Sequence, residues 1–136
     1  MFIDLIRNRR SIRKFTNEAI EAHKIEVLKE AALRPPSSMG HNPWEYVFVN
    51  DPQLLAGLSK AKPHGSSFLT DARLGIVVCA DPEKSAVWIE DASIATIFIQ
   101  LTAESLGLGS CWVQIRGRMH DDNKSAGKYI AEQLNI

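Results

Sequence analysis

The segment from Arg7 to Lys14 concentrates positive charge in a chain that carries none overall. Across the 136 residues, 16 Lys and Arg balance 16 Asp and Glu. The segment nevertheless holds five cations around a single serine: Arg7, Arg9, Arg10, Arg13 and Lys14 around Ser11. Guanidinium groups meet phosphate oxygens two at a time, and a serine hydroxyl adds a neutral hydrogen bond. This segment, called the basic octet below, fits a small anionic ligand and fits a solvated helix end equally well.

Several common catalytic patterns are missing from the rest of the chain. It has no G-x-x-x-x-G-K-[ST] loop and no G-x-S-x-G elbow. Gly107-Leu108-Gly109 joins a predicted helix to a predicted strand, the reverse of the order in a dinucleotide fold. Metal-ligand spacing is lacking among the histidines, which are His23, His41, His64 and His120. Without an acid–base or nucleophile set, any chemistry is expected to come from a cofactor, with no catalytic side chain and no metal.

Composition and length predict one globular domain over residues 1–136. The chain is 45% hydrophobic and 24% charged, which is typical of a globular protein. Balanced charge argues against nucleic acid as a partner, and the N-terminus lacks the order of a signal peptide. Cys79 and Cys111 lie in apolar runs and are expected to be buried thiols without a disulfide. These features favour a cytoplasmic protein.

The elements that position these residues follow from hydrophobic spacing and from the prolines. Ile25, Leu28 and Ala32 form the inward stripe of a helix that ends before Pro35. The continuous apolar run from Leu74 to Ala80 is typical of a strand covered on both faces. We predict helices over 2–8, 18–33, 52–58, 83–106 and 123–134, and strands over 44–49, 74–80 and 110–115. Asp121-Asp122 suits a cap for the last helix. The order indicates an α+β domain with a small sheet.

The helix predicted from Glu83 to Leu106 is apolar in almost every direction. Such a helix is buried on all sides, either at the centre of a domain or inside a subunit interface. Asp91, Gln100 and Glu104 argue against a membrane span. Small residues on the same helix would permit close approach of a partner helix; they are Ala92, Ser93, Ala95 and Thr96.

Three motifs occur in an order that resembles one known family. They are Arg9-Arg10-Ser11-Ile12-Arg13-Lys14-Phe15, Pro36-Ser37-Ser38 through Asn42-Pro43-Trp44, and Gly107-Leu108-Gly109-Ser110-Cys111-Trp112. Together they resemble the nitroreductase family of FMN-dependent oxidoreductases, over almost the whole chain. The resemblance implies an α+β fold with a small mixed or antiparallel sheet flanked by helices.

The resemblance also implies a role for each matching residue. Arg9, Arg10 and Ser11 match the segment that grips the FMN phosphate and ribityl chain, and Arg13 matches a position that reaches the flavin ring. Pro36, Ser37 and Ser38 match a loop that touches the flavin held mainly by the other subunit. Asn42 matches an amide near the polar edge of the ring. Trp112, Val113 and Gln114 match a strand end beside the isoalloxazine, where a backbone N–H points at the flavin. Ordinary sheet packing is the alternative for Trp112 and Val113. An ordinary loop that ends a helix is the alternative for Pro36-Ser37-Ser38.

The activity that the resemblance implies is reduction of nitroaromatics, quinones or related electrophilic acceptors. FMN would be reduced by NADH or NADPH and reoxidised by the acceptor in a ping-pong cycle. A homodimer is implied, with the long helices packed across its two-fold axis and the flavins in the interface. The alternatives are a non-catalytic protein that binds or sequesters flavin, and a structural subunit with an anion-binding turn.

One departure from the family pattern concerns the C-terminal side. Family members usually continue with another strand and an arm that crosses onto the partner subunit. The sequence ends at Ile136, and it is either naturally minimal or a piece of a longer product. Without such an arm the basic octet would have to hold the phosphate largely alone, and the departure bears on dimer stability and on flavin affinity.

Overall fold

The computed structural model describes residues 1–136 and divides into two compact units. Unit 1 comprises Met1–Ile12, Ile20–Val47 and Ile76–Cys111. Unit 2 comprises Arg13–Ala19, Phe48–Gly75 and Trp112–Ile136. Each unit is described by itself below. The expectation of a single domain over the whole chain stays a prediction.

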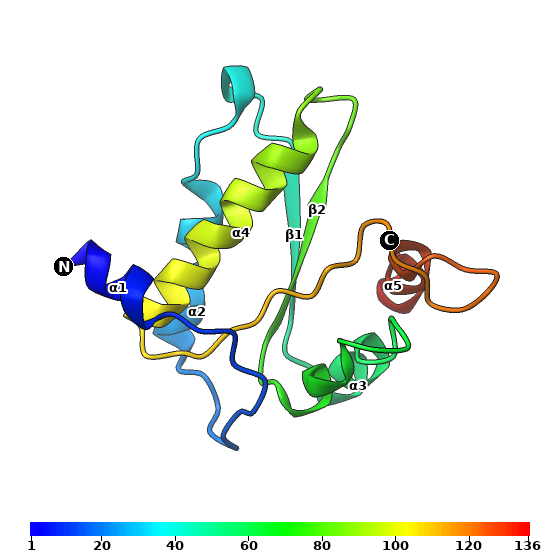
Figure 1. The fold of residues 1–136 in the computed structure, drawn as a ribbon, viewed down its shortest axis with the longest axis horizontal. Helices are drawn as coiled ribbons and strands as arrows, with labels where there is room; N and C mark the ends of the chain where they lie inside the picture. Colours follow the sequence, from blue (N-terminus) through cyan, green and yellow to red (C-terminus); the bar gives the residue numbers. More distant parts are fainter. The chain divides into compact units, whose positions relative to one another are not determined.

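A two-stranded sheet lies mainly in unit 1 (Figure 1). β1 covers Trp44–Val49 and β2 covers Gly75–Ala80. The Asp81 N–H donates to the Pro43 carbonyl at 2.9 Å, so the end of β2 lies beside the start of β1 and the strands are antiparallel. β2 is half-buried along five of its six residues. The expectation that it is covered on both faces is therefore wrong within this chain.

Three α-helices belong to unit 1 (Figure 1). They are α1 (Phe2–Asn8), α2 (Ala22–Leu33) and α4 (Trp88–Ser105). Both α1 and α2 pack against α4, and α2 buries Leu28 and Ala32 there as predicted. α4 begins five residues later than expected because Asp81 opens a turn instead. Its carboxylate accepts the Glu83 N–H at 2.9 Å, and its carbonyl accepts the Lys84 N–H at 3.2 Å.

α2 also begins later than predicted, at Ala22 rather than near Glu18. Residues 13–19 belong to unit 2, so the chain reaches the packing of unit 1 only at Ile20. Tertiary context therefore overrides the helical propensity of the Glu18–Glu21 segment.

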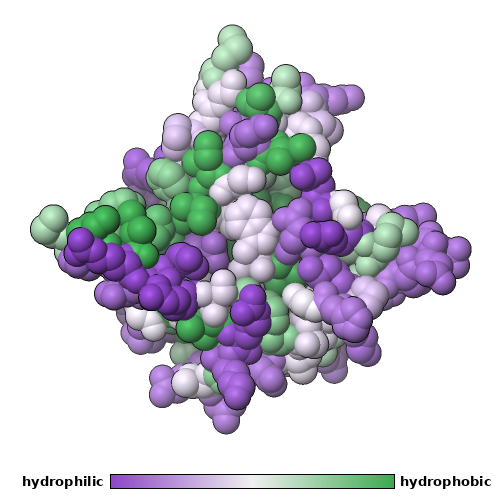
Figure 2. Space-filling model, in the orientation of Figure 1, coloured by the Kyte–Doolittle hydropathy of each residue, from purple (hydrophilic) through white to green (hydrophobic).

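α4 is covered on one face only. Ala95 and Ile99 are buried, whereas Ile94, Ile97 and Phe98 are 39%, 42% and 39% exposed. Figure 2 shows hydrophobic surface over α1 and along α4. α4 therefore does not lie at the centre of this chain, and the other expected position, inside a subunit interface, stays a prediction. None of the helices has the length and apolar content needed to cross a membrane.

Unit 2 contains α3 (Pro52–Leu58), the short 3-10 helix η2 (Ser67–Asp71) and α5 (Ala126–Leu134). α3 packs against both of the others and buries Leu55 and Leu58. The Asp51 carboxylate caps α3 by accepting two backbone N–H groups at 2.8 and 3.0 Å. The Tyr129 hydroxyl donates to the Gly57 carbonyl at 2.9 Å and ties α5 to α3.

Ser125, not Asp121-Asp122, caps the last helix. The Ser125 hydroxyl accepts the Lys128 N–H at 3.2 Å. The Asp121 carboxylate instead accepts the N–H groups of Asn123 and Lys124, both at 2.8 Å, and closes a turn before the helix. α5 consequently starts at Ala126 rather than at Asn123.

The strand predicted from Ser110 to Ile115 does not form. Ser110 makes one isolated parallel bridge to Ser11, and the Ile12 N–H donates to the Ser110 carbonyl at 2.9 Å. From Trp112 onward the chain belongs to unit 2, so no neighbouring strand extends the pairing. The apolar alternation alone was insufficient because a strand also needs a partner backbone.

Candidate functional site

The basic octet begins on α1 and continues beyond it. Arg7, in the last turn of α1, pairs with Asp4 at 3.5 Å. No carboxylate lies within 4.0 Å of the side-chain nitrogens of the four remaining cations, which are Arg9, Arg10, Arg13 and Lys14. Arg9 ends α1 and is half-buried. In a chain of zero net charge, four cations without acidic partners create a local positive field that attracts anions.

Arg10 has a structural role that the sequence did not reveal. Its Nη1 donates to the carbonyls of Arg7 and Arg9, both at 2.8 Å. Carbonyls at a helix C-terminus lack intrahelical donors and carry partial negative charge, so a guanidinium there stabilises the end of α1. The remaining guanidinium N–H groups point to no acceptor in the chain and can still meet an anion.

Ser11 is held beside the turn that follows α4. Gly107 ends the helix with φ +74, a conformation that glycine adopts without steric cost. A Cβ on Gly109 would lie 2.9 Å from Ile12 Cγ2, so only glycine permits this close approach. The Gln100 side chain, 7% exposed, donates to the Ser110 hydroxyl at 3.4 Å. The glycine motif therefore fixes the backbone next to Ser11.

The loop from Pro36 to Asn42 is shaped by its own side chains. The Ser37 hydroxyl accepts the Asn42 N–H at 2.9 Å and donates to Asn42 Oδ1 at 2.8 Å. A short 3-10 helix, η1 (Ser38–Gly40), lies between them. Three backbone φ angles in the loop are positive, those of Met39, Gly40 and Asn42. The side-chain amide nitrogen of Asn42, Nδ2, forms no hydrogen bond in the chain and can donate to a ligand.

Asp91 holds this loop from α4, although sequence reasoning did not assign it to the site. Its Oδ1 accepts the Ser38 N–H at 3.0 Å, and its Oδ2 accepts the Ser85 hydroxyl at 2.7 Å. Its backbone carbonyl accepts the Trp44 indole N–H at 3.2 Å. Asp91 is 2% exposed. A carboxylate inside an apolar helix was the available signal, because buried carboxylates require specific partners.

In unit 2, the segment from Trp112 to Gln114 is fixed by side chains rather than by a sheet. The Trp112 indole N–H donates to Gln114 Oε1 at 3.2 Å, and Gln114 Nε2 donates to the Arg116 carbonyl at 2.9 Å. Lys62 Nζ donates to the Gln114 carbonyl at 2.9 Å. The backbone N–H groups of Val113 and Gln114 donate to no atom of the chain. Unpaired backbone donors of this kind are available to an acceptor on a ligand.

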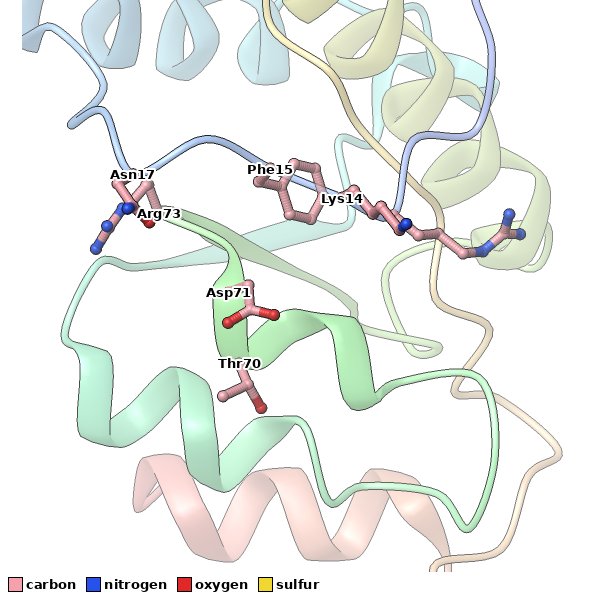
Figure 3. A pocket seen from close by; sticks show the side chains of 7 residues that line it. Lys14, Phe15, Asn17, Thr70, Asp71 and Arg73 are labelled. Carbon is pink, nitrogen blue, oxygen red and sulfur yellow. The ribbon is translucent and has the colours of Figure 1, made fainter.

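Arg13, also in unit 2, lines an open pocket of about 420 Å³. Figure 3 shows Lys14 and Phe15 on one wall, and Asp71 at the end of η2 on another. Phe15 packs against Phe68 with ring centroids 6.4 Å apart. Three cations and one carboxylate line the pocket without pairing to one another, so its potential is net positive.

The resolved pKa shifts place no poised acid or base in either unit. Burial, with Glu45 as a smaller cause, raises the pKa of the Cys79 thiol, and burial raises the pKa of Tyr46. Both groups therefore stay neutral at pH 7. Cys79 and Cys111 are not joined, and they are half-buried rather than buried as expected. General acid–base catalysis favours groups with a pKa near the working pH. The resolved shifts all move the pKa values farther from pH 7.

The site residues predicted from the sequence divide between the two units. Unit 1 contains seven of the eleven: Arg9, Arg10, Ser11, Pro36, Ser37, Ser38 and Asn42. Unit 2 contains Arg13, Trp112, Val113 and Gln114. Within unit 1 the structure adds Asp91 and Gly109, and within unit 2 it adds Lys62, each through a contact described above.

Comparison with known proteins gives the family. The family model described as the nitroreductase family matches residues 6–64. A protein of Archaeoglobus fulgidus named "Putative NADH dehydrogenase/NAD(P)H nitroreductase" is 38% identical over 120 residues, covering 85% of this chain and 68% of its own length. The chain belongs to the nitroreductase family.

A solved structure and a more distant relative extend this result. The FMN-dependent nitroreductase of Clostridium difficile R20291 is 50% identical with a TM-score of 0.97, over 98% of this chain and 78% of that chain. The FMN reductase (NADPH) of Bacillus subtilis is 27% identical over 82% of this chain and 53% of its own length. The expected nitroreductase fold, with its small antiparallel sheet and flanking helices, is confirmed.

Proposed function

We propose that this nitroreductase-family chain is an FMN-dependent oxidoreductase that uses NADH or NADPH to reduce small electrophilic acceptors. The observation that carries the proposal is the likeness to the Clostridium difficile FMN-dependent nitroreductase, at 50% identity over 98% of the chain. Nitroaromatics and quinones are the acceptor classes proposed. Bound FMN would supply the redox chemistry, accepting hydride from the nicotinamide and delivering electrons to the acceptor.

The residues present are chemically suited to FMN. A phosphate near charge −2 is well served by guanidinium groups, and Arg9 has no acidic partner inside the chain. In this proposal Arg9, Arg10 and Ser11 bind the phosphate and ribityl chain, while Arg13 reaches toward the ring. The N–H groups of Val113 and Gln114, which lack acceptors in the chain, supply donors for the ring nitrogens and carbonyls.

The loop residues orient the ring and exclude water in the same proposal. Pro36, Ser37 and Ser38 form a wall, and the free amide donor of Asn42 meets a flavin carbonyl. No side chain of this chain acts as acid, base or nucleophile. Positioning and electrostatics are the contributions of the protein.

A homodimer forms part of the proposal. α1 and α4 pack together and both present apolar side chains to solvent, including Ile6 at 48% and Ile97 at 42% exposure. Contiguous apolar surface of this kind is typical of subunit interfaces. The flavin-binding loop belongs to the same unit as this surface, which suits a flavin held at a dimer interface.

Two measurements test the proposed function together. Purified protein should be yellow or take up added FMN, with a visible flavin spectrum. It should then oxidise NADH or NADPH in the presence of a nitroaromatic or quinone. Failure to take up FMN would reject the proposal, and tight FMN binding without turnover would favour the flavin-sequestering alternative.

Arginine substitutions within the basic octet provide a matched pair. Arg9→Ala should weaken FMN binding by roughly 10- to 100-fold, since a hydrogen bond to a charged group contributes about 1.5–3 kcal/mol. Arg7→Ala is the control. Because Arg7 already pairs with Asp4, this variant should leave FMN affinity unchanged. Fluorescence quenching of FMN measures both. Equal losses in the two variants would indicate a general charge effect rather than a phosphate contact.

A further inference from the structure

Asp91 is a buried carboxylate that no cation neutralises. It lies in the first turn of α4 and is 2% exposed. No Lys, Arg or His nitrogen lies within 4.0 Å of its oxygens. Burying a carboxylate is costly unless hydrogen bonds replace its hydration. Two such bonds do so here, from the Ser38 N–H at 3.0 Å and the Ser85 hydroxyl at 2.7 Å.

These two bonds connect α4 to two separate loops of unit 1. Ser38 begins η1 in the loop of residues 36–42, and Ser85 precedes α4 and is 3% exposed. The Ser85 hydroxyl also accepts the Val87 N–H at 3.3 Å, which fixes its orientation. Charge-assisted hydrogen bonds are shorter and stronger than neutral ones, so Asp91 defines the distance between loop and helix.

The loop depends on this connection because its other hydrogen bonds are internal. Gly40 bonds back to Ser37, His41 to Ser38, and Asn42 to the Ser37 hydroxyl. Of the hydrogen bonds made by residues 37–42, the one from Ser38 to Asp91 is the bond that leaves the segment. Backbone with positive φ at non-glycine residues, as at Met39 and Asn42, persists only where its surroundings hold it.

We infer that Asp91 is the positioning residue of the flavin-binding loop. It fixes the Ser38 N–H, and with it the path of residues 36–42, in the shape that contacts FMN. The inference rests on the proposed function for its ligand. The loop-holding role itself rests on the hydrogen bonds of unit 1 alone and can be measured without flavin.

Substitutions of Asp91 separate positioning from a general loss of stability. Asp91→Ala removes both acceptors and should weaken FMN binding by about 10-fold or more. Asp91→Asn should restore binding to within about 3-fold, because the amide oxygen accepts the Ser38 N–H and the amide nitrogen donates to Ser85. The control is Ser59→Ala, which removes another buried hydroxyl bond, 2.6 Å to the Ala56 carbonyl in unit 2. It should lower thermal stability without changing FMN affinity.

A second pair of variants tests the same bond from the loop side. Ser38→Pro deletes the N–H that Asp91 accepts, and Ser38→Ala deletes only the hydroxyl. Ser37 has φ −136 and ψ 158, an extended conformation that suits the residue before proline. Ser38→Pro should therefore fold and weaken FMN binding more than Ser38→Ala. If the bond is the cause, combining Ser38→Pro with Asp91→Ala should add little further loss.

Hydrogen exchange of flavin-free protein completes the test. Asp91→Ala should speed amide exchange in residues 37–42, whereas Asp91→Asn and Ser59→Ala should leave it near the wild-type rate. Unchanged exchange and unchanged FMN affinity in Asp91→Ala would overturn the inference. If Asp91→Ala fails to fold, Ser38→Pro and Ser38→Ala decide it through the same readouts. Wild-type protein that binds no FMN would instead overturn the proposed function, and the exchange rates would still decide whether Asp91 holds the loop.

Discussion

The two compact units use their polar groups differently. In unit 1, buried side chains bond to other side chains: Ser85 donates to Asp91 and Gln100 donates to Ser110, with Asp91, Ser85 and Gln100 all less than 8% exposed. In unit 2, the buried polar side chains are Ser59 and Ser66, whose hydroxyls donate to backbone carbonyls at 2.6 and 2.8 Å rather than to other side chains. The difference extends to the candidate site. The loop from Ser37 to Asn42 bonds to itself and to Asp91, whereas the segment around Val113 leaves backbone donors without acceptors.

This contrast suggests that the two units contribute different things to ligand binding. A loop whose groups are satisfied by the chain is already shaped before a ligand arrives, so its contribution is a preorganised surface. Backbone donors without acceptors gain a hydrogen bond only when a ligand supplies one, so their contribution is binding energy. Variants that break the hydrogen bonds of the loop should therefore change stability and loop order, and FMN affinity through them, whereas loss of the Val113 donor should change turnover with little change in stability.

The largest expected effect is in unit 2, at Val113. Val113→Pro removes an N–H that bonds to nothing in the chain, so the folded chain loses no internal hydrogen bond at that position. If this donor stabilises charge on the flavin, turnover with NAD(P)H and a quinone should fall on the order of 100-fold. Val113→Ala keeps the N–H and should retain most activity. Equal turnover in the two variants would remove the assigned role of the backbone donor.

A smaller effect is expected in unit 1, at Asn42, on stability as well as on the proposed hydrogen bond to FMN. Asn42 has φ 47 and accepts the Ser37 hydroxyl at 2.8 Å. Asn42→Ala loses that bond and replaces asparagine, which tolerates the left-handed region, with alanine, which tolerates it less, at a cost of about 1–3 kcal/mol. Asn42→Gly loses the same bond, but glycine adopts a positive φ without steric cost, so the loss of stability should be smaller. Urea unfolding measures the free energies, and an alanine variant as stable as the glycine variant would argue against a strained loop.

Much of the fold could be predicted from local sequence signals. β1 and α3 match their predicted bounds because their apolar patterns are bounded by turn residues and by Asp51-Pro52. The strand predicted at residues 110–115 does not form, and its absence could not be foreseen, since pairing depends on a partner backbone distant in sequence. The sequence also left two positions open for α4, the centre of the domain or a subunit interface, because an apolar helix does not indicate which neighbours cover it; the exposure of Ile97 contradicts the first.

The candidate site was predictable where it follows contiguous motifs. Arg9 and Ser11 could be named from the basic octet, but the role of Arg10 at the end of α1 depends on where its guanidinium points. Asp91 could not be assigned because its partners, Ser38 and Ser85, are separated from it by 53 and 6 positions and meet only in the fold. Hydrophobic periodicity carries no information on such hydrogen bonds.

The smallest expected effect is at the Lys124–Glu132 pair on the surface of unit 2. Their hydrogen bond lowers the pKa of Glu132 and raises the pKa of Lys124. Because the unfolded chain takes up protons on Glu132 first as pH falls, the stabilisation is present at neutral pH and is lost as pH drops through the folded-state pKa. It is likewise lost as pH rises through the folded-state pKa of Lys124.

Glu132→Gln should therefore lower the melting temperature slightly at neutral pH and not at all in acid. The difference should also shrink as salt is raised from about 0.05 to 1 M, since exposed pairs are screened. Thermal unfolding followed by circular dichroism at both salt concentrations, across acid and neutral pH, measures it. A loss as large as that of Asn42→Ala, or one insensitive to salt, would mean that this exposed pair of unit 2 contributes as much stability as the hydrogen bonds that shape the loop of unit 1, and the contrast between the units would fail.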